Sequence, residues 1–373
     1  MEILLKGGEI SVIDKWSKAE IALKSGADLV VELPTIYSVS SAENFAEGAV
    51  KILNSFNMPT SLIFGSECGD VKTLSKFADI LLEKPKEYVS ILNHELETGL
   101  SFPKARENAL LMYLNDIRKY ANVLSEPNNI LGIEYIKAIK KLKSNVQPLT
   151  IKRIESKYNS KEITSKFASA TAIRDIIKND SNLDRIKSFV PKSTYEILDN
   201  KLKYGQLISD ISVFEKEIIY ALRKMTVKEI LNLPDVSEGL ENRIKDACYS
   251  CNNLEELIDK IKSKRYTRTR IQRILLYALL NITKNDMLNS YKTIPYIRVL
   301  GVNSKGKALL SSISASNKKT HVITSVKKFM DSCNDKNLRS MLEKDILATN
   351  IYTLGYDYDS KANLDYTNKM ITI

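Results

Sequence analysis

Short apolar runs alternate with amphipathic stretches through the first half of the chain, and this alternation limits the folds open to it. Two runs rich in aliphatic residues, 27–34 and 61–67, end at a proline or a glycine-containing loop, as buried strands do. A third such run covers residues 146–154. Helical spacing accompanies them at residues 14–23, 42–53, 71–82, 104–114 and 129–139. Strands alternating with helices predict a parallel sheet with covered faces.

The second half of the chain divides by pattern into two further parts. Residues 184–283 have almost wholly helical spacing, and residues 201–204 are expected to be a linker. Two strand candidates, 295–301 and 320–324, flank a helix, and the tail beyond Ile346 is less regular. We therefore predict an α/β domain over residues 1–183, a helical, basic domain over residues 184–290 and a small α/β region over residues 291–373.

Composition narrows the class of protein. Apolar residues make up 43% and charged residues 27%, as in folded globular proteins, and no apolar run approaches the roughly 20 residues that span a bilayer. The N-terminus lacks a signal-peptide pattern, and four cysteines are too few for a disulfide scaffold. We expect a cytoplasmic protein with no membrane partner. The pair Cys248 and Cys251 lacks a second ligand pair, so no metal site is predicted.

Two segments have patterns suited to binding a nucleotide. Gly65 ends a strand, where a residue without a side chain lets the main chain approach a ligand closely, although a glycine there is also a common turn. Ser169 begins the segment Ser-Ala-Thr-Ala-Ile-Arg, which ends at Arg174. Hydroxyls and N–H groups at a helix start, with an arginine one turn later, suit phosphate oxygens. The alternative for this segment is a plain N-cap followed by a solvated arginine.

A basic stretch lies in the predicted helical domain. The net charge of the chain is +11, and residues 260–273 contain seven basic residues and no acidic one. With one tyrosine and two threonines interleaved, this stretch predicts contacts to the phosphates of a nucleic acid and a ring that stacks on a base. The alternative is a solvated basic helix face. The candidate RNA-binding residues are Lys264, Arg265, Tyr266, Arg268, Arg270 and Arg273.

Several motifs together resemble one enzyme family. The Ser169–Arg174 segment is similar to the Ser-Thr-x-Ile-Arg type signature of the HxGH nucleotidyltransferases, which join a substrate to AMP. Five further motifs match, in order, landmarks of the tRNA(Met) cytidine acetate ligases, and in order they are far more specific than any one alone. They are Val12-Ile-Asp-Lys-Trp16, Asp28-Leu-Val-Val-Glu-Leu-Pro34, Phe64-Gly-Ser-Glu67, Pro127-Asn-Asn-Ile-Leu-Gly-Ile-Glu-Tyr135, and Lys264-Arg-Tyr-Thr267 with Arg270-Ile-Gln-Arg273.

The resemblance implies an ATP-dependent tRNA-modifying ligase. Members activate acetate as acetyl-adenylate and transfer the acetyl group to N4 of the wobble cytidine of elongator tRNA(Met). The expected partners are therefore ATP, acetate and this tRNA, with Mg²⁺ inferred from ATP chemistry. The family's ATP contacts correspond to Gly65, Asn128 and the pair Arg153 and Ile154, with Asn129 as the near alternative to Asn128. We add Ser169 and Arg174 on the phosphate argument above.

The front of the chain departs from the family pattern. Members begin with a strand and a loop carrying H-x-G-H, whose imidazoles meet the ATP phosphates. The only histidines here, His94 and His321, lie in no such motif. The resemblance thus implies a Rossmann-like nucleotidyltransferase domain without its first strand and loop, a segment of on the order of 30 residues. An upstream start, a frameshift or a degenerate copy each explains this. We expect weak or no ATP-dependent activity from these 373 residues alone.

Two other functions remain open on sequence. One is an RNA-binding protein that keeps the tRNA surface of its relatives but not their catalysis. The other is an adenylyltransferase that acts on a small metabolite, although such enzymes do not need a basic helical domain.

Overall fold

The structure is a computed structural model of the 373-residue chain. It describes residues 4–5, 9–116, 120, 123–153, 168–180, 183–237, 239–317 and 320–373. The strands are β1 (Leu4–Leu5), β2 (Glu9–Ile10), β3 (Leu29–Glu32), β4 (Ser61–Ser66), β5 (Gln147–Lys152), β6 (Ile297–Val302), β7 (Val322–Ile323) and β8 (Ile371–Thr372).

Helices make up most of the rest. Those of the first half are α1 (Lys15–Lys24), α2 (Thr35–Ser38), α3 (Ala42–Ser55), α4 (Val71–Glu83), α5 (Lys86–Glu97), α6 (Phe102–Leu114), α8 (Pro127–Lys141) and α9 (Ala170–Asn179). Those of the second half are α10 (Lys192–Lys203), α11 (Glu215–Lys224), α12 (Val227–Leu231), α13 (Leu240–Ser250), α14 (Leu254–Ile261), α15 (Arg268–Leu279), α16 (Lys284–Lys292), α17 (Ser304–Ser316), α18 (Val326–Ser332), α19 (Lys336–Tyr352) and α20 (Leu364–Thr367).

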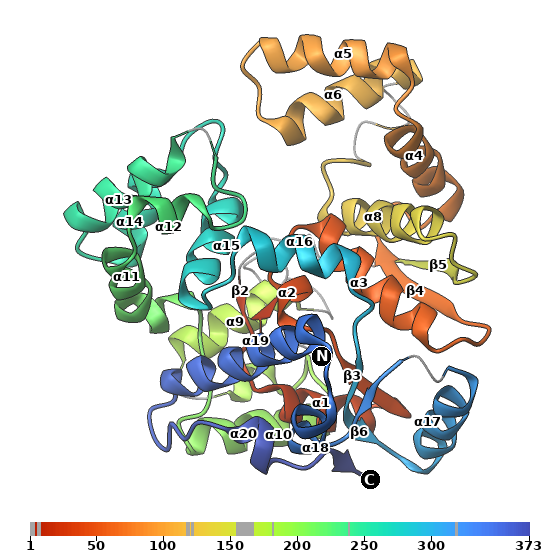
Figure 1. Ribbon diagram of the computed structural model, residues 1–373, viewed down its shortest axis with the longest axis vertical. Coiled ribbons are helices and arrows are strands. Elements are labelled where there is room, and N and C mark those ends of the chain that lie inside the picture. The colour runs from red at the N-terminus through yellow and green to blue at the C-terminus, as the bar shows by residue number, and fades with distance from the viewer. Residues whose placement is uncertain are drawn as a thin grey trace.

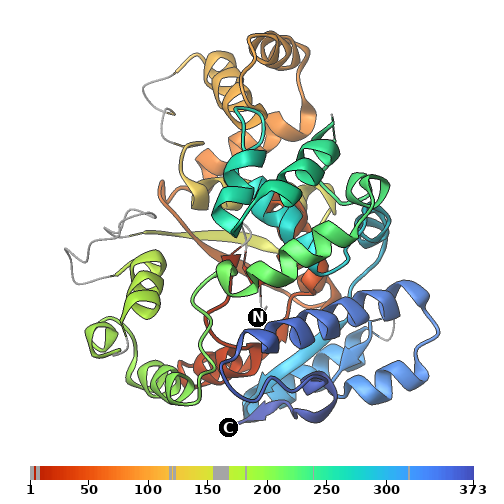
Figure 2. The ribbon, with the colours of Figure 1, turned by 90° about the vertical axis from the view of Figure 1, so that its left-hand side faces the viewer.

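The molecule has a body with two lobes above it. Figure 1 shows α1, β3, β6 and α17 to α20 in the lower body, α11 to α15 in one lobe, and α4 to α6 in the other. Figure 2, turned by 90°, shows the long helix α19 lying across the body below the two lobes. The predicted mixed α/β class, with a largely helical second part, is confirmed.

β4 and β5 form the parallel sheet that the sequence predicted. They pair in register over six residues, 61–66 opposite 147–152. Helix α8 covers one face, and Phe64 of β4 is buried beneath it. A Cβ on Gly132 of α8 would lie 2.5 Å from the Phe64 ring, so this close approach of helix and strand requires glycine.

The other face of this sheet is open in the described part of the chain. Ile63, Leu149 and Ile151 are 59%, 47% and 65% exposed on it. Exposed positions alternate with more buried ones along β4 and with half-buried ones over residues 147–151 of β5, as the period of a strand requires. The predicted sheet with both faces covered is therefore wrong for β4 and β5.

β3 does not join that sheet. It pairs antiparallel with β6, and β6 pairs in parallel with β7 and β8 on its other edge. All six residues of β6 are buried, so this strand needs neighbours on both edges for its backbone groups. The expectation of one parallel sheet for all three early strands is wrong for β3. The division into domains stays a prediction, although its first and third parts share this sheet.

Residues 201–204 are not a linker. The first three form the last turn of α10, and Tyr204 is its C-cap. Leu198 and Leu202 stand one turn apart and pack in an apolar cluster with Ile13 and Ile176. This packing explains why a polar-looking segment continues the helix.

A buried ion-pair network ties the C-terminal segments to the first strands. The Lys15 ammonium, fully buried, lies 2.7 Å from Glu32 and 2.6 Å from Asp365. The Arg298 guanidinium contacts the same two carboxylates at 2.9 and 2.5 Å. Two cations therefore balance two anions, which is the condition under which buried charges are tolerated.

Asp345 of α19 adds a carboxyl group beside this network. It accepts hydrogen bonds from the Thr35 backbone N–H, at 2.6 Å, and from the Tyr296 hydroxyl. Burial, and then the nearby charge of Glu32, raise the pKa of Asp345 to about 7. The neutral form is favoured because an ionised Asp345 would leave the cluster with one anion in excess.

This raised pKa predicts a pH dependence of stability. The unfolded carboxyl loses its proton near its ordinary pKa of 3.8, whereas the folded one keeps it to about 7. The folded state therefore binds more protons between these values, and its free energy of unfolding falls as the pH rises. Between pH 5 and pH 8, the free energy of unfolding of the wild type should fall by about 1–3 kcal/mol more than that of Asp345→Asn.

Urea unfolding at the two pH values measures this effect. Glu343→Gln is the matched control, because Glu343 is exposed on the same helix. An equal pH dependence in wild type and Asp345→Asn would contradict the assignment.

Candidate nucleotide site

Gly65 and Arg153 meet at the carboxyl ends of the two parallel strands. Gly65 pairs with Ile151, and the Arg153 backbone N–H donates to the Ser66 carbonyl at 3.0 Å. A Cβ on Gly65 would lie 3.4 Å from Cγ of Arg153, so the arginine side chain passes over the glycine. Carboxyl ends of parallel strands are where α/β proteins bind ligands, and here a bare backbone and a cation lie together.

The start of α8 reaches the same place. The side-chain amide NH2 group of Asn128 donates to Oε1 of Glu67 at 2.6 Å, and the Asn129 backbone N–H donates to Oε2 at 2.9 Å. Oδ1 of Asn129 in turn accepts the Cys68 backbone N–H at 3.0 Å. Three hydrogen bonds thus join the loop after β4 to the first turn of α8.

We call the group Gly65, Glu67, Asn128, Asn129 and Arg153 the carboxyl-end site. It brings together four of the residues predicted from the sequence. Glu67 was not predicted to belong to it, although its position directly after the strand residue Ser66 was a usable signal. The site offers the backbone of Gly65, the amide side chain of Asn128 and the guanidinium of Arg153, a set suited to a nucleotide.

The other predicted nucleotide residues have contacts elsewhere or are not described. Ser169 is the N-cap of α9, and its hydroxyl accepts the Ala172 N–H at 3.0 Å. Arg174 forms an ion pair with Glu9 at 2.5 Å. The arginine is therefore paired within the protein and not simply solvated. Ile154 lies outside the described residues.

A large cavity lies away from this site. It has a volume of about 810 Å³ and lies at the amino ends of β4 and β5, between loops 53–61 and 143–147. None of the predicted residues lines it. The predicted side chains gather at the opposite ends of the strands, so this cavity is separate from the carboxyl-end site.

Most arginines of the basic stretch are held by acceptors within the protein. Arg268 makes two contacts with the Glu255 carboxylate, at 2.5 and 2.7 Å. Arg270 donates to the Asp235 carbonyl, and Arg273 pairs with the Asp235 carboxylate at 2.8 Å. Lys264 and Arg265 are exposed in the loop before α15. The stretch therefore presents fewer exposed charges than its sequence suggested.

Tyr266 is not a free stacking ring. It is 8% exposed, and the Arg270 guanidinium lies 5.0 Å from its ring centre. Its hydroxyl donates to the Ser237 carbonyl at 3.3 Å. The expected exposed ring is wrong for this conformation, because the tyrosine packs into the core of the helical lobe.

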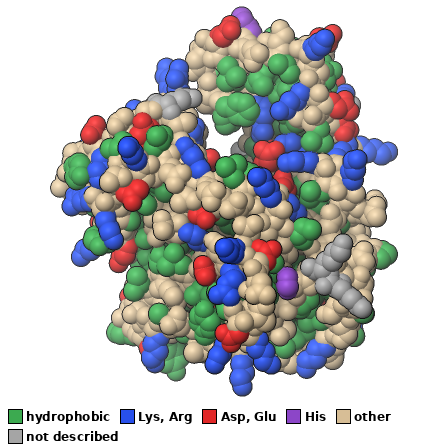
Figure 3. Space-filling view, viewed as in Figure 1, with side chains coloured by type: hydrophobic (Ala, Val, Ile, Leu, Met, Phe, Trp, Pro, Cys, Tyr) green, Lys and Arg blue, Asp and Glu red, His purple; other side chains and the backbone are tan. Residues whose placement is uncertain are grey.

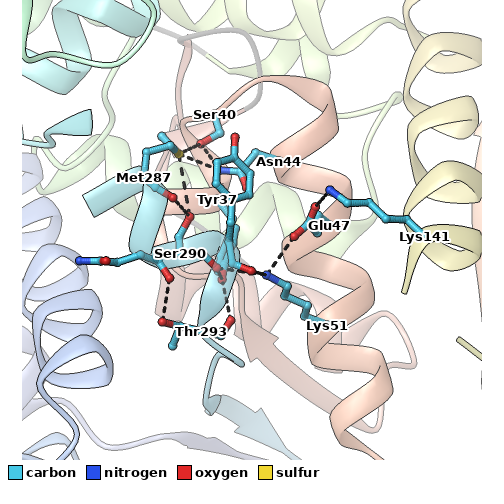
Figure 4. Close-up of polar contacts among 11 residues, drawn as sticks. Tyr37, Ser40, Asn44, Glu47, Lys51, Lys141, Met287, Ser290 and Thr293 are labelled. Carbon is cyan, nitrogen blue, oxygen red and sulfur yellow. Dashed lines mark hydrogen bonds and ion pairs between the residues drawn. The ribbon is translucent and has the colours of Figure 1, made fainter. Parts of the chain in front are cut away.

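An ion-pair junction links α8 to α3 and α16. Figure 4 shows Glu47 of α3 between Lys51 and Lys141, whose ammonium groups lie 3.0 and 2.8 Å from its carboxylate. Lys51 also donates to the carbonyls of Ser290 and Tyr291 near the end of α16. Burial alone would raise the pKa of Glu47, but hydrogen bonds from Lys141 and Lys51 bring it below its ordinary value. The junction therefore connects α8, whose first turn belongs to the carboxyl-end site, to α3 and α16.

Comparison with known proteins gives consistent results at three levels. A model of the HIGH nucleotidyl transferase family matches residues 4–367. The tRNA(Met) cytidine acetate ligase of Acetivibrio thermocellus is 42% identical over 98% of this chain and 90% of its own. That of Caldanaerobacter subterraneus is 44% identical over 98% and 89%.

Solved structures agree with these relatives. TmcAL of Thermotoga maritima superposes in its apo form with a TM-score of 0.93, at 30% identity, over 100% of this chain and 90% of its own. The form bound with alpha-thio ATP has a TM-score of 0.90 over the same shares. Among the helices of the described residues, none is long and apolar enough to cross a membrane.

The junction yields a prediction on stability. Glu47→Gln keeps the shape of the side chain but leaves the largely buried Lys51 without its anion. We expect the free energy of unfolding at neutral pH to fall by about 1–3 kcal/mol, the range for a buried polar group that loses one partner, because Lys51 keeps its two carbonyl acceptors. Glu43→Gln, one turn earlier and on an exposed carboxylate, should change it by less than about 0.5 kcal/mol. Chemical unfolding measures the free energy of unfolding of both variants. Equal losses in Glu47→Gln and Glu43→Gln would exclude this role for Glu47.

Proposed function

The chain belongs to the HIGH nucleotidyl transferase family and, within it, to the tRNA(Met) cytidine acetate ligases, and on this premise we propose that it acetylates the wobble cytidine of elongator tRNA(Met) with acetate and ATP. The observation that supports this most directly is the convergence of Gly65, Asn128, Asn129 and Arg153 at the carboxyl ends of β4 and β5. The cytoplasm, where tRNA is modified, is the proposed location.

The reaction has two steps. An acetate oxygen attacks the α-phosphorus of ATP, and the bond to the departing pyrophosphate breaks. The N4 amine of cytidine then attacks the carbonyl carbon of acetyl-adenylate, AMP leaves, and the amine loses a proton. Both steps depend on positioning the reacting groups and on stabilising negative charge on phosphate.

In this proposal the carboxyl-end site binds ATP. Gly65 lets the nucleotide approach the backbone, and Arg153 supplies positive charge. Asn128 and Asn129 contribute from the first turn of α8, where Glu67 holds them. Ile154, the next residue in the chain, keeps the part in ATP binding that the family resemblance implies. Ser169 and Arg174 approach the phosphates from α9, which requires Arg174 to exchange Glu9 for a phosphate oxygen.

Mg²⁺ enters the proposal only as a companion of the ATP phosphates. In the part of the chain that the structure describes, no three carboxylate, histidine or cysteine side chains converge to hold a metal ion. The described residues therefore do not form a metal site, and we assign no step to one.

The tRNA surface is proposed along the helical lobe. Figure 3 shows the molecule hollowed between the lobe of α11 to α15 and the lobe of α5 and α6, with Lys and Arg side chains along both rims. Lys264 and Arg265 contribute exposed charge. Arg268, Arg270 and Arg273 hold the loops of this lobe in place, and Tyr266 supports them from within.

The product of the reaction tests the proposal. The chain is incubated with ATP, Mg²⁺, acetate and elongator tRNA(Met), and nuclease digestion with mass spectrometry measures N4-acetylcytidine. Because these 373 residues lack an H-x-G-H motif, we expect only a low yield of acetylcytidine, and its formation should require both ATP and acetate. Binding of tRNA without any binding of ATP would favour the RNA-binding alternative, which the lack of an H-x-G-H motif in these 373 residues supports. Acid-dependent pyrophosphate release without tRNA acetylation would favour a metabolite adenylyltransferase.

The glycine of the site gives a sharper test. Gly65→Val places branched carbons where the ligand should lie, whereas Gly132→Ala acts through packing against Phe64. We expect Gly65→Val to weaken ATP binding about tenfold or more with little change in thermal stability. Gly132→Ala should lower thermal stability. Titration calorimetry and thermal unfolding measure the two effects, and unchanged ATP affinity in Gly65→Val would move the site elsewhere.

Salt dependence tests the tRNA surface. Each phosphate contact adds about 0.7–0.9 to the slope of log affinity against log salt. The double charge reversal Lys264→Glu with Arg265→Glu should therefore weaken tRNA binding and flatten this slope by about 1–2. Lys327→Glu with Lys328→Glu, an equal charge change at exposed positions of α18, is the control. Equal effects of the two variants would contradict a local tRNA contact.

A further inference from the structure

Glu67 leaves the side chain of Asn128 with a single possible orientation. Both oxygens of a carboxylate accept hydrogen bonds and neither donates. Only the NH2 group of the Asn128 amide can therefore face Glu67 across the 2.6 Å contact. The carbonyl oxygen of the same amide must then point the other way. Amides usually have two orientations of similar energy, but this contact removes one of them.

The second oxygen of Glu67 prevents a rearrangement. It accepts the backbone N–H of Asn129, and a backbone N–H cannot reverse its direction. The first turn of α8 needs this acceptor, because its N-cap Glu126 makes no side-chain hydrogen bond to the N–H groups of that turn. Asn129 is 1% exposed and is itself held by the loop at Cys68. Glu67 is thus fixed at both oxygens.

We propose that Glu67 is a positioning residue for base recognition: it holds Asn128 so that the amide carbonyl accepts a hydrogen bond from the amino group of adenine. This inference rests on the proposed ATP site. An acceptor held in one orientation binds the amino group of ATP and rejects the C6 carbonyl oxygen of inosine triphosphate, which is also an acceptor. The site then prefers ATP over nucleotides that carry an oxygen at this position.

Glu67→Gln should reverse this preference. The glutamine carbonyl must take the Asn129 N–H, because that donor is fixed, so the glutamine amine faces Asn128. Asn128 then turns its carbonyl toward Gln and its amine toward the ligand. We expect the ratio of ATP affinity to inosine triphosphate affinity to fall by roughly tenfold or more, through weaker binding of ATP and tighter binding of inosine triphosphate.

Two further variants separate positioning from a general loss of structure. Asn128→Ala should bring the two nucleotide affinities close together, and adding Glu67→Gln to it should not change their ratio further. Glu126→Gln carries the same charge change at the adjacent N-cap, which makes no side-chain cap, and should keep the wild-type ratio. Thermal unfolding of each variant verifies that it is folded.

Titration calorimetry with ATP and with inosine triphosphate on the 373-residue chain gives all these ratios without catalysis. A fall in the ratio for Glu67→Gln that disappears in the Asn128→Ala background supports the inference. Equal weakening of both nucleotides, no change, or a fall that persists in that background overturns it. Failure to acetylate tRNA while ATP selectivity behaves as described counts against the proposed function alone. A wild-type chain that binds no ATP overturns both.

Discussion

The parallel pairing of β4 with β5 is the constraint on which the candidate site depends. These strands lie more than 80 residues apart in the chain, yet their register places Gly65 beside Ile151 and carries Arg153 to the same edge. Helix α8 can lie close against β4 because it has glycine at position 132, and its first turn then reaches the loop after that strand. A shift of one residue in this pairing would turn every side chain of the strand to the opposite face and disperse the group.

Buried charge determines how the remaining parts attach. Lys15 and Arg298 share the carboxylates of Glu32 and Asp365, which brings together α1, β3, β6 and α20. Such pairs add little net free energy over apolar contacts, because each ion loses its hydration, but a wrong partner leaves a charge unpaired and is strongly disfavoured. Glu47 plays the same part between α3, α8 and α16. The main effect of these contacts is therefore to select one arrangement of the elements that they join. Their net contribution to the free energy of unfolding is small by comparison.

The basic stretch illustrates how charge in a sequence differs from charge on a surface. Seven basic residues without an acidic one suggested a continuous patch, but acceptors on α14 and in the loop after α12 hold three of the arginines. Glu255 of α14 pairs with Arg268. Asp235 accepts a hydrogen bond from Arg270 on its backbone carbonyl and forms an ion pair with Arg273 through its carboxylate. Lys262, Lys264 and Arg265 are exposed in the loop before α15. Partners distant in sequence thus decide which cations are available to a nucleic acid.

The sequence by itself determined the local structure, the family and the candidate residues. Periodicity and caps located most helices and the strands β3 to β7, because these signals lie within a few residues of one another, and ordered motifs identified the family. Tertiary structure alone decided that β3 pairs with β6, that residues 201–203 continue α10, and that Tyr266 is buried. It also revealed Glu67, whose role depends on Asn128 and Asn129 some 60 residues later. Hydrogen bonds and pairings between distant segments leave no periodic trace in a single sequence, so only the folded chain shows them.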